Sequence, residues 1–174
     1  MNDLKELCSF SSNLSVSLVY QASRDGFRAK DFHLKCDGLL NTLVVVKSSN
    51  GYVFGGFTAV DWSSGGSLSN YKYDSSAFMF SLINKYNYPF KMKIINPDYA
   101  VYASDYMGPV FGSGNDLAIS DDSDKNYYSY AMIGNTYQLP PFLVQNHQNA
   151  QSFLADSYYF KTFQVEVFLV NGKK

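Results

Sequence analysis

The sequence of 174 residues has few of the side chains on which most metal and catalytic sites depend. It contains two histidines, two cysteines, and only two glutamates among its fifteen acidic residues. A tetrahedral zinc site made of His and Cys would need all four of those side chains from distant segments, which argues against such a site. Cys8 and Cys36 lack CxxC spacing, and this usage is typical of reduced thiols in a cytosolic protein.

Charge is also scarce and balanced, with 14 Lys and Arg against 15 Asp and Glu and a net charge of −1. Arg24 and Arg28, the only arginines, occupy one short stretch rather than a basic face, so a nucleic acid partner is not expected. No apolar run approaches the ~20 residues of a membrane span. The first ten residues include Asp3 and Glu6, where a signal peptide would be basic and then apolar. We therefore expect a cytoplasmic protein without membrane insertion.

The chain is rich in apolar and small polar residues instead. Hydrophobic residues make up 46% of it and aromatic residues 17%, which is enough for one domain to bury a core without a disulfide or a structural metal. Serine, asparagine, glycine and tyrosine are abundant, and this bias favours strands and turns over helices. The composition predicts a single, mostly β domain.

Period-2 alternation and short apolar runs predict a series of strands. The best helix is 28–37, in which Phe32 and Cys36 lie four residues apart and Gly38 follows as a C-cap. Many short strands with few helices and no βαβ alternation favour a two-sheet antiparallel β-sandwich flanked by a few short helices. The predicted strands are 14–20, 42–46, 52–54, 77–83, 90–95, 117–119 and 162–170, and 127–137 is expected to be extended.

Turn signals separate these strands. Asn50-Gly51 predicts a hairpin with a type I′ turn, and Gly55-Gly56 indicates a bulge or a close approach of another backbone. The segment 108–114 is expected to be a glycine-rich loop, and 24–27 and 121–126 are expected to be turns.

The last predicted strand has apolar residues on both faces, so we expect it to be central in its sheet. Phe163, Val165, Val167 and Leu169 should share one face, and Glu166 lies on the other with Phe168 and Val170. A carboxylate in this position needs hydrogen-bond partners. Arg24, Arg28 or the backbone amides of the glycine-rich loop are the expected partners of Glu166.

Tests for catalytic and metal motifs favour structural interpretations. Cys36 continues the apolar stripe of its helix, so core packing is favoured over a reactive thiol paired with His33. The run that starts at Asp122 resembles the opening of a calcium loop but has Tyr127 and Ile133 where glycine and glutamate are needed. Gly112-Ser113-Gly114 matches neither the dinucleotide nor the phosphate-loop pattern. We expect no metal site, no catalytic residues and no cofactor.

Several segments taken together resemble the TLDc domain family in the variant found in protists. They are Leu18 to Phe27, the helix around Phe32 to Cys36, Thr42 to Phe57, Ala77 to Leu82, Gly108 to Leu117, and Phe163 to Phe168. The resemblance covers about residues 14–170, with 1–13 as a lead-in and 171–174 as a polar tail. It implies a two-sheet sandwich without an established catalytic centre or cofactor.

The resemblance also implies a function. Family members include oxidation-resistance proteins, and several bind the vacuolar-type proton ATPase and alter its assembly. The chain is thus expected to be a monomeric, non-catalytic protein-interaction module with an ATPase subunit as partner and a link to oxidative-stress protection. Binding residues carried over with the family's motifs are Arg24, Asp25, Gly26, Gly112, Gly114, Asp116 and Glu166.

Two alternatives stay open. One is a thiol-based, peroxide-reactive protein that uses Cys36. The other is a sandwich that binds a small ligand or carbohydrate in an aromatic groove. Exposure of Tyr127, Tyr128 and Tyr130 on one face would favour this groove.

Overall fold

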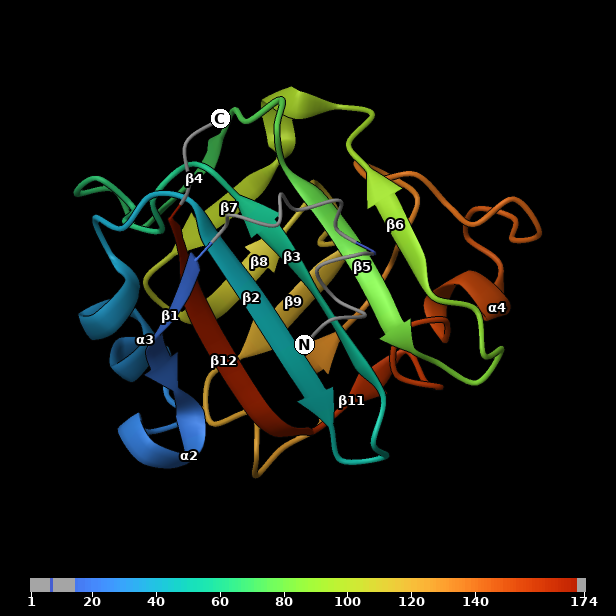
Figure 1. Cartoon of the computed structure of the whole chain (residues 1–174), viewed down its shortest axis with the longest axis horizontal. Helices are drawn as coiled ribbons and strands as arrows, with labels where there is room; N and C mark the ends of the chain where they lie inside the picture. The colour runs from blue at the N-terminus through green and yellow to red at the C-terminus, as the bar shows by residue number, and fades with distance from the viewer. Residues whose placement is uncertain (1–6, 8–14, 172–174) are drawn as a thin grey trace.

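Two six-stranded antiparallel sheets form the protein in a computed structural model, which describes Leu7 and residues 15–171 (Figure 1). Sheet A has the order β1-β12-β2-β3-β5-β6, and sheet B the order β11-β10-β9-β8-β7-β4. The expected mostly β sandwich with short helices is confirmed. Sheet A contains β1 (Ser15–Gln21), β2 (Thr42–Ser48), β3 (Val53–Thr58), β5 (Phe78–Ile83), β6 (Phe90–Lys93) and β12 (Thr162–Asn171). Sheet B contains β4 (Ser69–Lys72), β7 (Val101–Ser104), β8 (Met107–Phe111), β9 (Leu117–Ser120), β10 (Ser129–Tyr130) and β11 (Tyr159–Phe160).

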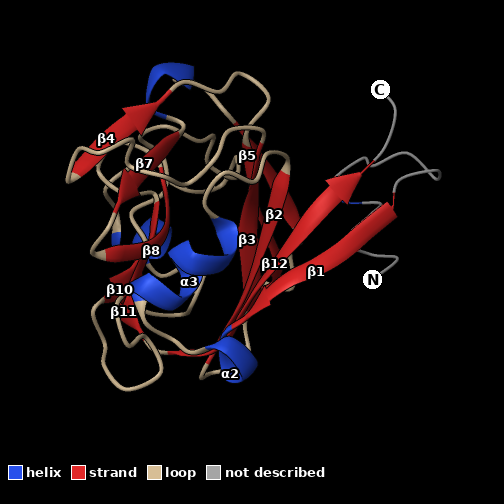
Figure 2. Ribbon diagram, turned by 90° about the vertical axis from the view of Figure 1, so that its left-hand side faces the viewer, coloured by secondary structure: helices blue, strands red, loops and turns tan. Residues whose placement is uncertain are grey.

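Within residues 15–171, four short helical segments connect the strands. These are α2 (Ala22–Asp25), α3 (Ala29–Cys36), the 3₁₀ turn η1 (Pro97–Tyr99) and α4 (Gln148–Gln151). In Figure 2, α3 lies between the two sheets at one side of the sandwich, and α2 lies at the end of the sandwich beneath it. The predicted helix over 28–37 is confirmed apart from its end residues, and Gly38 follows it with a φ of +76°, as expected for a C-terminal glycine.

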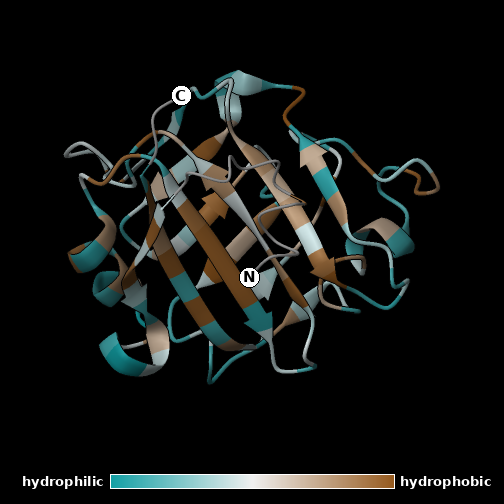
Figure 3. Cartoon of the chain, viewed as in Figure 1, coloured by the Kyte–Doolittle hydropathy of each residue, from teal (hydrophilic) through white to brown (hydrophobic). Residues whose placement is uncertain are grey.

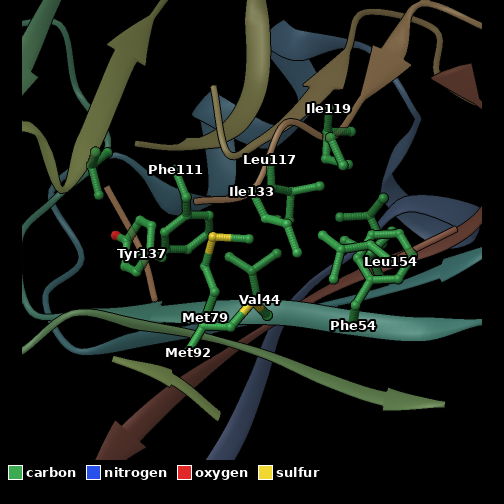
Figure 4. Close-up of a cluster of buried hydrophobic side chains, with 14 of the residues drawn as sticks. Val44, Phe54, Met79, Met92, Phe111, Leu117, Ile119, Ile133, Tyr137 and Leu154 are labelled. Atoms are coloured by element: carbon green, nitrogen blue, oxygen red, sulfur yellow. The ribbon is translucent and has the colours of Figure 1, made fainter. Parts of the chain in front are cut away.

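The main core fills the space between the sheets. In Figure 4, Val44 and Phe54 project from sheet A toward Phe111, Leu117 and Ile119 of sheet B. The hydropathy of the elements agrees with this arrangement (Figure 3). Strand β2, which contributes to the core, is hydrophobic along its middle, whereas α2 at the end of the sandwich is polar. This burial of apolar surface supplies the main driving force for folding.

Trp62 links α3 to both sheets. Its ring packs edge-on against Phe32 and Phe111 with centroids 5.4 Å from each. Its indole N–H donates to Thr42 Oγ1 over 2.9 Å, so the polar atom of this buried ring is satisfied.

The two central glycines of β3 mark a close approach, one of the two expected outcomes. A Cβ on Gly55 would overlap the carbonyl oxygen of Val44, and one on Gly56 would overlap the Phe111 ring. The register shift in β3 lies instead between Val53 and Phe54. Small residues here let β2 and sheet B pack tightly against β3.

Strand β12 is central, as predicted, because it pairs with β1 on one side and β2 on the other. The expected shared face is correct for Val165 and Val167, which are buried in the main core. It is wrong for Phe163, which is 64% exposed. The pairing with β2 shifts register between Thr162 and Gln164, and such a bulge re-aims the extra side chain.

The same mechanism changes β1. A register shift between Leu18 and Tyr20 breaks the predicted alternation. Val19 and Tyr20 both contact the main core, whereas Leu18 is 38% exposed. Leu14 and the lead-in, apart from Leu7, lie outside the described residues.

Two turn predictions and one prediction of extended structure need correction. The Asn50-Gly51 hairpin exists, but only Gly51 has a positive φ, and Gly51 N–H donates to the Ser48 carbonyl. That geometry fits a type I turn followed by a left-handed glycine rather than type I′.

Residues 108–111 belong to β8 rather than to a loop. Pro109 lies inside a register shift of this strand, where a missing N–H is tolerated. The 127–137 segment contains only the two-residue strand β10.

Candidate functional site

The turn between α2 and α3 forms a concave corner at one end of the sandwich. Gly26 sits at its centre with a φ of +112°, and a Cβ at this position would overlap the Asp31 carboxylate. The Tyr20 hydroxyl donates to the Gly26 carbonyl over 2.7 Å, which fixes the turn to the core. Glycine is required at this position both for its backbone conformation and for lack of space.

Both arginines of the chain lie on this corner, and each is held by an aspartate. Arg24 donates from Nε and Nη2 to the two Asp25 oxygens over 3.0 and 2.7 Å. Arg28 does the same to Asp31 over 3.0 and 3.2 Å. About half of each arginine side chain is exposed, at 51% and 50%. We call Arg24, Asp25, Gly26, Arg28 and Asp31 the arginine corner.

The aspartates of the arginine corner are ionised at neutral pH. Hydrogen bonding to Arg24 lowers the pKa of Asp25 to about 2, and bonding to Arg28 lowers the pKa of Asp31. Neither carboxyl carries a proton to donate at neutral pH, and both are weak bases. Their role is to orient the guanidinium groups.

A hollow of ≈ 640 Å³ opens on the arginine corner. Phe27 contributes an apolar wall, and the turn between β9 and β10 closes the far side with Asp122, Asp124 and Lys125. The Ala29 N–H donates to Asp121 over 2.7 Å, which attaches the start of α3 to that turn. Both positive and negative side chains therefore line the hollow.

Glu166 connects to this corner, but not through the expected partners. Its Oε1 accepts from Gln21 Nε2 over 2.8 Å, and the Gln21 N–H donates to Asp25 over 2.9 Å. Gln21 lies opposite Glu166 in the pairing of β1 with β12. The sequence did not single out Gln21, because its role depends on this register.

The other predicted site residues form a second, separate group. The Asp116 carboxylate is fully buried and accepts hydrogen bonds from the backbone N–H groups of residues 134–137, the shortest 2.8 Å from Gly134. Gly112 and Gly114 have positive φ angles, and a Cβ on Gly112 would overlap Asp116. No hydrogen bond within the described part of the chain joins this group to the arginine corner. These three residues therefore hold a turn together.

Burial raises the pKa of Asp116 to about 6, although the four N–H donors lower it in part. Loss of hydration destabilises the charged carboxylate by more than the four backbone N–H groups stabilise it. Its place in the interior gives a partner no access to it.

Two further hollows lead from the arginine corner to the β2–β3 turn, because each shares lining residues with the hollow before it. Figure 1 shows α2 and the β2–β3 turn at the lower edge of the molecule. One of ≈ 540 Å³ is lined by Ser23, Phe27, Asp124, Lys161 and Phe163, among others. The next, of ≈ 300 Å³, lies between Lys47 and Phe163 beside the β2–β3 turn. Sequence reasoning missed Lys47, Lys161 and Phe163, because the bulge that exposes Phe163 leaves no mark in the alternation pattern.

The thiol alternative finds little support at Cys36. Its side chain is fully buried, and burial raises the pKa of the thiol, opposite to the shift a reactive cysteine needs. Both ring nitrogens of His33 have other partners, because Nδ1 contacts the Asp37 carboxylate over 2.7 Å and Nε2 contacts the carbonyl oxygens of Ser104 and Met107 over 2.9 and 3.0 Å. Cys8 lies outside the described residues.

The aromatic groove is only partly formed. Tyr127 and Tyr128 are 59% and 73% exposed, but Tyr130 is half-buried and its hydroxyl accepts from Asn115. No ring contact joins the three among the described side chains. Nor does the described part of the chain gather three His, Cys, Asp or Glu side chains in an arrangement that could hold a metal ion.

Comparison with known proteins adds two findings. The family model described as TLDc domain matches residues 1–171. No curated protein matches the sequence. In the described residues, no helix has the length and apolar character needed to cross a membrane.

Proposed function

Because this chain belongs to the TLDc domain family, we propose that it is a non-catalytic protein-interaction module and that its partner is a subunit of a vacuolar-type proton ATPase. The observation that carries the proposal is the arginine corner. Two half-exposed guanidinium groups, each held by a carboxylate, line a hollow of ≈ 640 Å³. Arginine is among the residues most enriched at energetic centres of protein interfaces.

The geometry of the corner favours binding over chemistry. A side chain that is already oriented loses little conformational entropy when a partner arrives. Each guanidinium keeps N–H groups beyond those given to its aspartate, and these are available to a partner's carboxylates or carbonyl groups. The aspartates of the corner, with their lowered pKa values, are poor proton donors and poor bases.

The link to oxidative stress is part of the proposal, and we assign it to partner binding rather than to thiol chemistry. Full burial of Cys36 with a raised thiol pKa supports this assignment. A cytoplasmic location and a monomeric state stay predictions.

A pull-down from lysate of the source cell tests the proposal. The tagged full chain should recover ATPase subunits, identified by mass spectrometry, and the double substitution Arg24→Ala with Arg28→Ala should lower recovery at least ~10-fold. Lys93→Ala is the matched control, because Lys93 is an exposed cation on the edge strand β6.

Two results would count against it. Recovery of no ATPase subunit would remove this partner. Equal recovery by the double variant and the native chain would show that the arginine corner is not the binding surface.

A further inference from the structure

Phe163 is placed on the surface by the bulge at the start of β12. It is the extra residue between Thr162 and Gln164, which pair with Ser48 and Lys47 of β2. Its ring is 64% exposed. A single exposed aromatic residue is common in folded proteins, so the surroundings of the ring decide whether it is a site.

Those surroundings combine a second exposed ring with two lysines. Lys47 Nζ lies 5.2 Å from the centroid of Phe163, and Lys161 Nζ lies 4.9 Å from the centroid of Tyr127. Tyr127 is 59% exposed. We call Lys47, Tyr127, Lys161 and Phe163 the Phe163 strip.

The Phe163 strip is held firmly in place. The Ser49 N–H donates to the Lys161 carbonyl over 3.0 Å, and the Thr162 N–H donates to the Ser123 carbonyl over 2.9 Å. Phe163 separates hollows of ≈ 300 and ≈ 540 Å³. An apolar side chain could therefore enter beside the ring without a rearrangement of the backbone.

The charged side chains around Phe163 indicate which kind of partner the strip would bind. Neither Lys47 nor Lys161 takes part in an ion pair among the described residues. Among the described residues, Asp124 is the one acid that lines either of the two hollows beside Phe163, and its Oδ1 is buried without a hydrogen-bond partner. Lysines that already lie over aromatic rings favour a partner that supplies carboxylates.

The strip is continuous with the arginine corner. Gln164, the residue after Phe163, donates from Nε2 to Ser23 Oγ over 2.6 Å and accepts from the Ser23 N–H over 3.1 Å. Ser23 and Phe27 line the hollows on both sides of this junction. One elongated partner segment could thus contact both regions.

We propose that the Phe163 strip binds an acidic segment of a partner protein that carries an apolar side chain, with the apolar group against the Phe163 ring and carboxylates at Lys47 and Lys161. The inference rests on the proposed function as an interaction module, and it names the chemistry of the partner's segment. A nucleic acid is disfavoured, because two lysines neutralise too few phosphates.

Fluorescence anisotropy with a synthetic probe tests the inference. The probe is a labelled peptide of about ten residues, mostly glutamate with one central leucine, a length suited to groove recognition. It should bind the full chain, and added salt should weaken binding because the attraction is partly electrostatic. Phe163→Ala should weaken binding ~10-fold or more, and Lys47→Ala with Lys161→Ala should remove most of the salt dependence.

Leu34→Ala is the matched control, since Leu34 is an 82% exposed apolar residue on α3. It should bind the probe like the native chain. Thermal unfolding of each variant shows whether it is folded, and the exposed position of Phe163 predicts little change. Equal binding by Phe163→Ala, equal binding of a lysine-rich version of the peptide, or no binding at all would overturn the inference.

The outcome separates this inference from the proposed function. If Phe163→Ala still recovers ATPase subunits while the arginine variant does not, the strip is not part of the interface and the proposed function stands. If no subunit is recovered but the peptide binds through Phe163, the strip is supported and the proposed partner is wrong. Dimerisation in sedimentation velocity that Phe163→Ala abolishes would instead make a second copy the occupant and overturn the inference.

Discussion

A carboxylate with no exposed surface, that of Asp116, fixes the conformation of residues 134–137. Four successive backbone N–H groups point at it. The resemblance to the TLDc family predicted Asp116 and Glu166 as binding residues, but the sequence could not show which groups they contact. Asp116 binds backbone N–H groups of residues 134–137, and Glu166 binds Gln21. Both interactions join residues that are far apart in the chain.

The raised pKa of Asp116 should be visible in the pH dependence of the free energy of unfolding. Its pKa is about 6 in the folded chain against an ordinary value of 3.8, so the folded state holds this proton more tightly than the unfolded state. Asp116 should therefore lower the free energy of unfolding by on the order of 2 kcal/mol as the pH rises from about 4 to about 6. Urea denaturation across this range measures the effect.

The variant Asp116→Asn serves as the comparison, because it cannot ionise and should lack this slope. Asp25, with its pKa lowered to about 2, acts in the opposite sense, since its contribution is lost as the pH falls below about 4. The two effects occupy different pH ranges. An unchanged slope in Asp116→Asn would assign the pH dependence to another group.

At the scale of elements, the strands with clear alternation or continuous apolar runs were predictable, and those shaped by bulges were not. Thr42 to Val46 and Phe78 to Leu82 lie within strands as expected. Residues 108–111 form a strand despite two turn-forming residues, because β9 and β7 provide partners for β8. Strands β4 and β7 were not predicted, because each has only four residues and therefore little periodic signal.

Strand β3 provides a test of close packing. Gly55→Ala would place a methyl group against the Val44 carbonyl, and β2 and β3 would have to separate. We expect a loss of about 3 kcal/mol in the free energy of unfolding, measured by denaturant titration.

Gly51→Ala is the matched control for this substitution. Gly51 has a φ of +88° but nothing within 4 Å of an added Cβ, so only backbone strain of about 1 kcal/mol should appear. A smaller loss for Gly55→Ala than for Gly51→Ala would contradict the packing argument.

At the scale of the whole molecule, the buried thiol of Cys36 reports on global unfolding. It has no exposed surface and lies in the main core with Phe32 and Trp62. In a Cys8→Ser background, a thiol reagent should label Cys36 only through opening of the core, and the labelling rate should rise with urea in parallel with unfolding.

Rapid labelling of native Cys36 would revive the thiol alternative, and sulfenic acid at this residue after mild peroxide would do the same. The two proposed binding surfaces also belong to this scale. Their residues come from α2, α3 and the turn between them, from β2 and β12, and from the segments just before β10 and β12, so only the assembled fold reveals the hollows. Arg24 could be predicted from the sequence as a site residue, but the hollows that it and Arg28 border could not.

The position of β12 has a consequence for synthesis of the protein. This strand lies between β1 and β2, and Ser15 Oγ donates to the Asn171 carbonyl across 156 positions of the chain. Until residues 162–171 leave the ribosome, β1 has no neighbour in sheet A and the edge of β2 is unpaired. Such long-range closure slows folding and prolongs exposure of strand edges. The growing chain should therefore depend on chaperone protection until β12 is released.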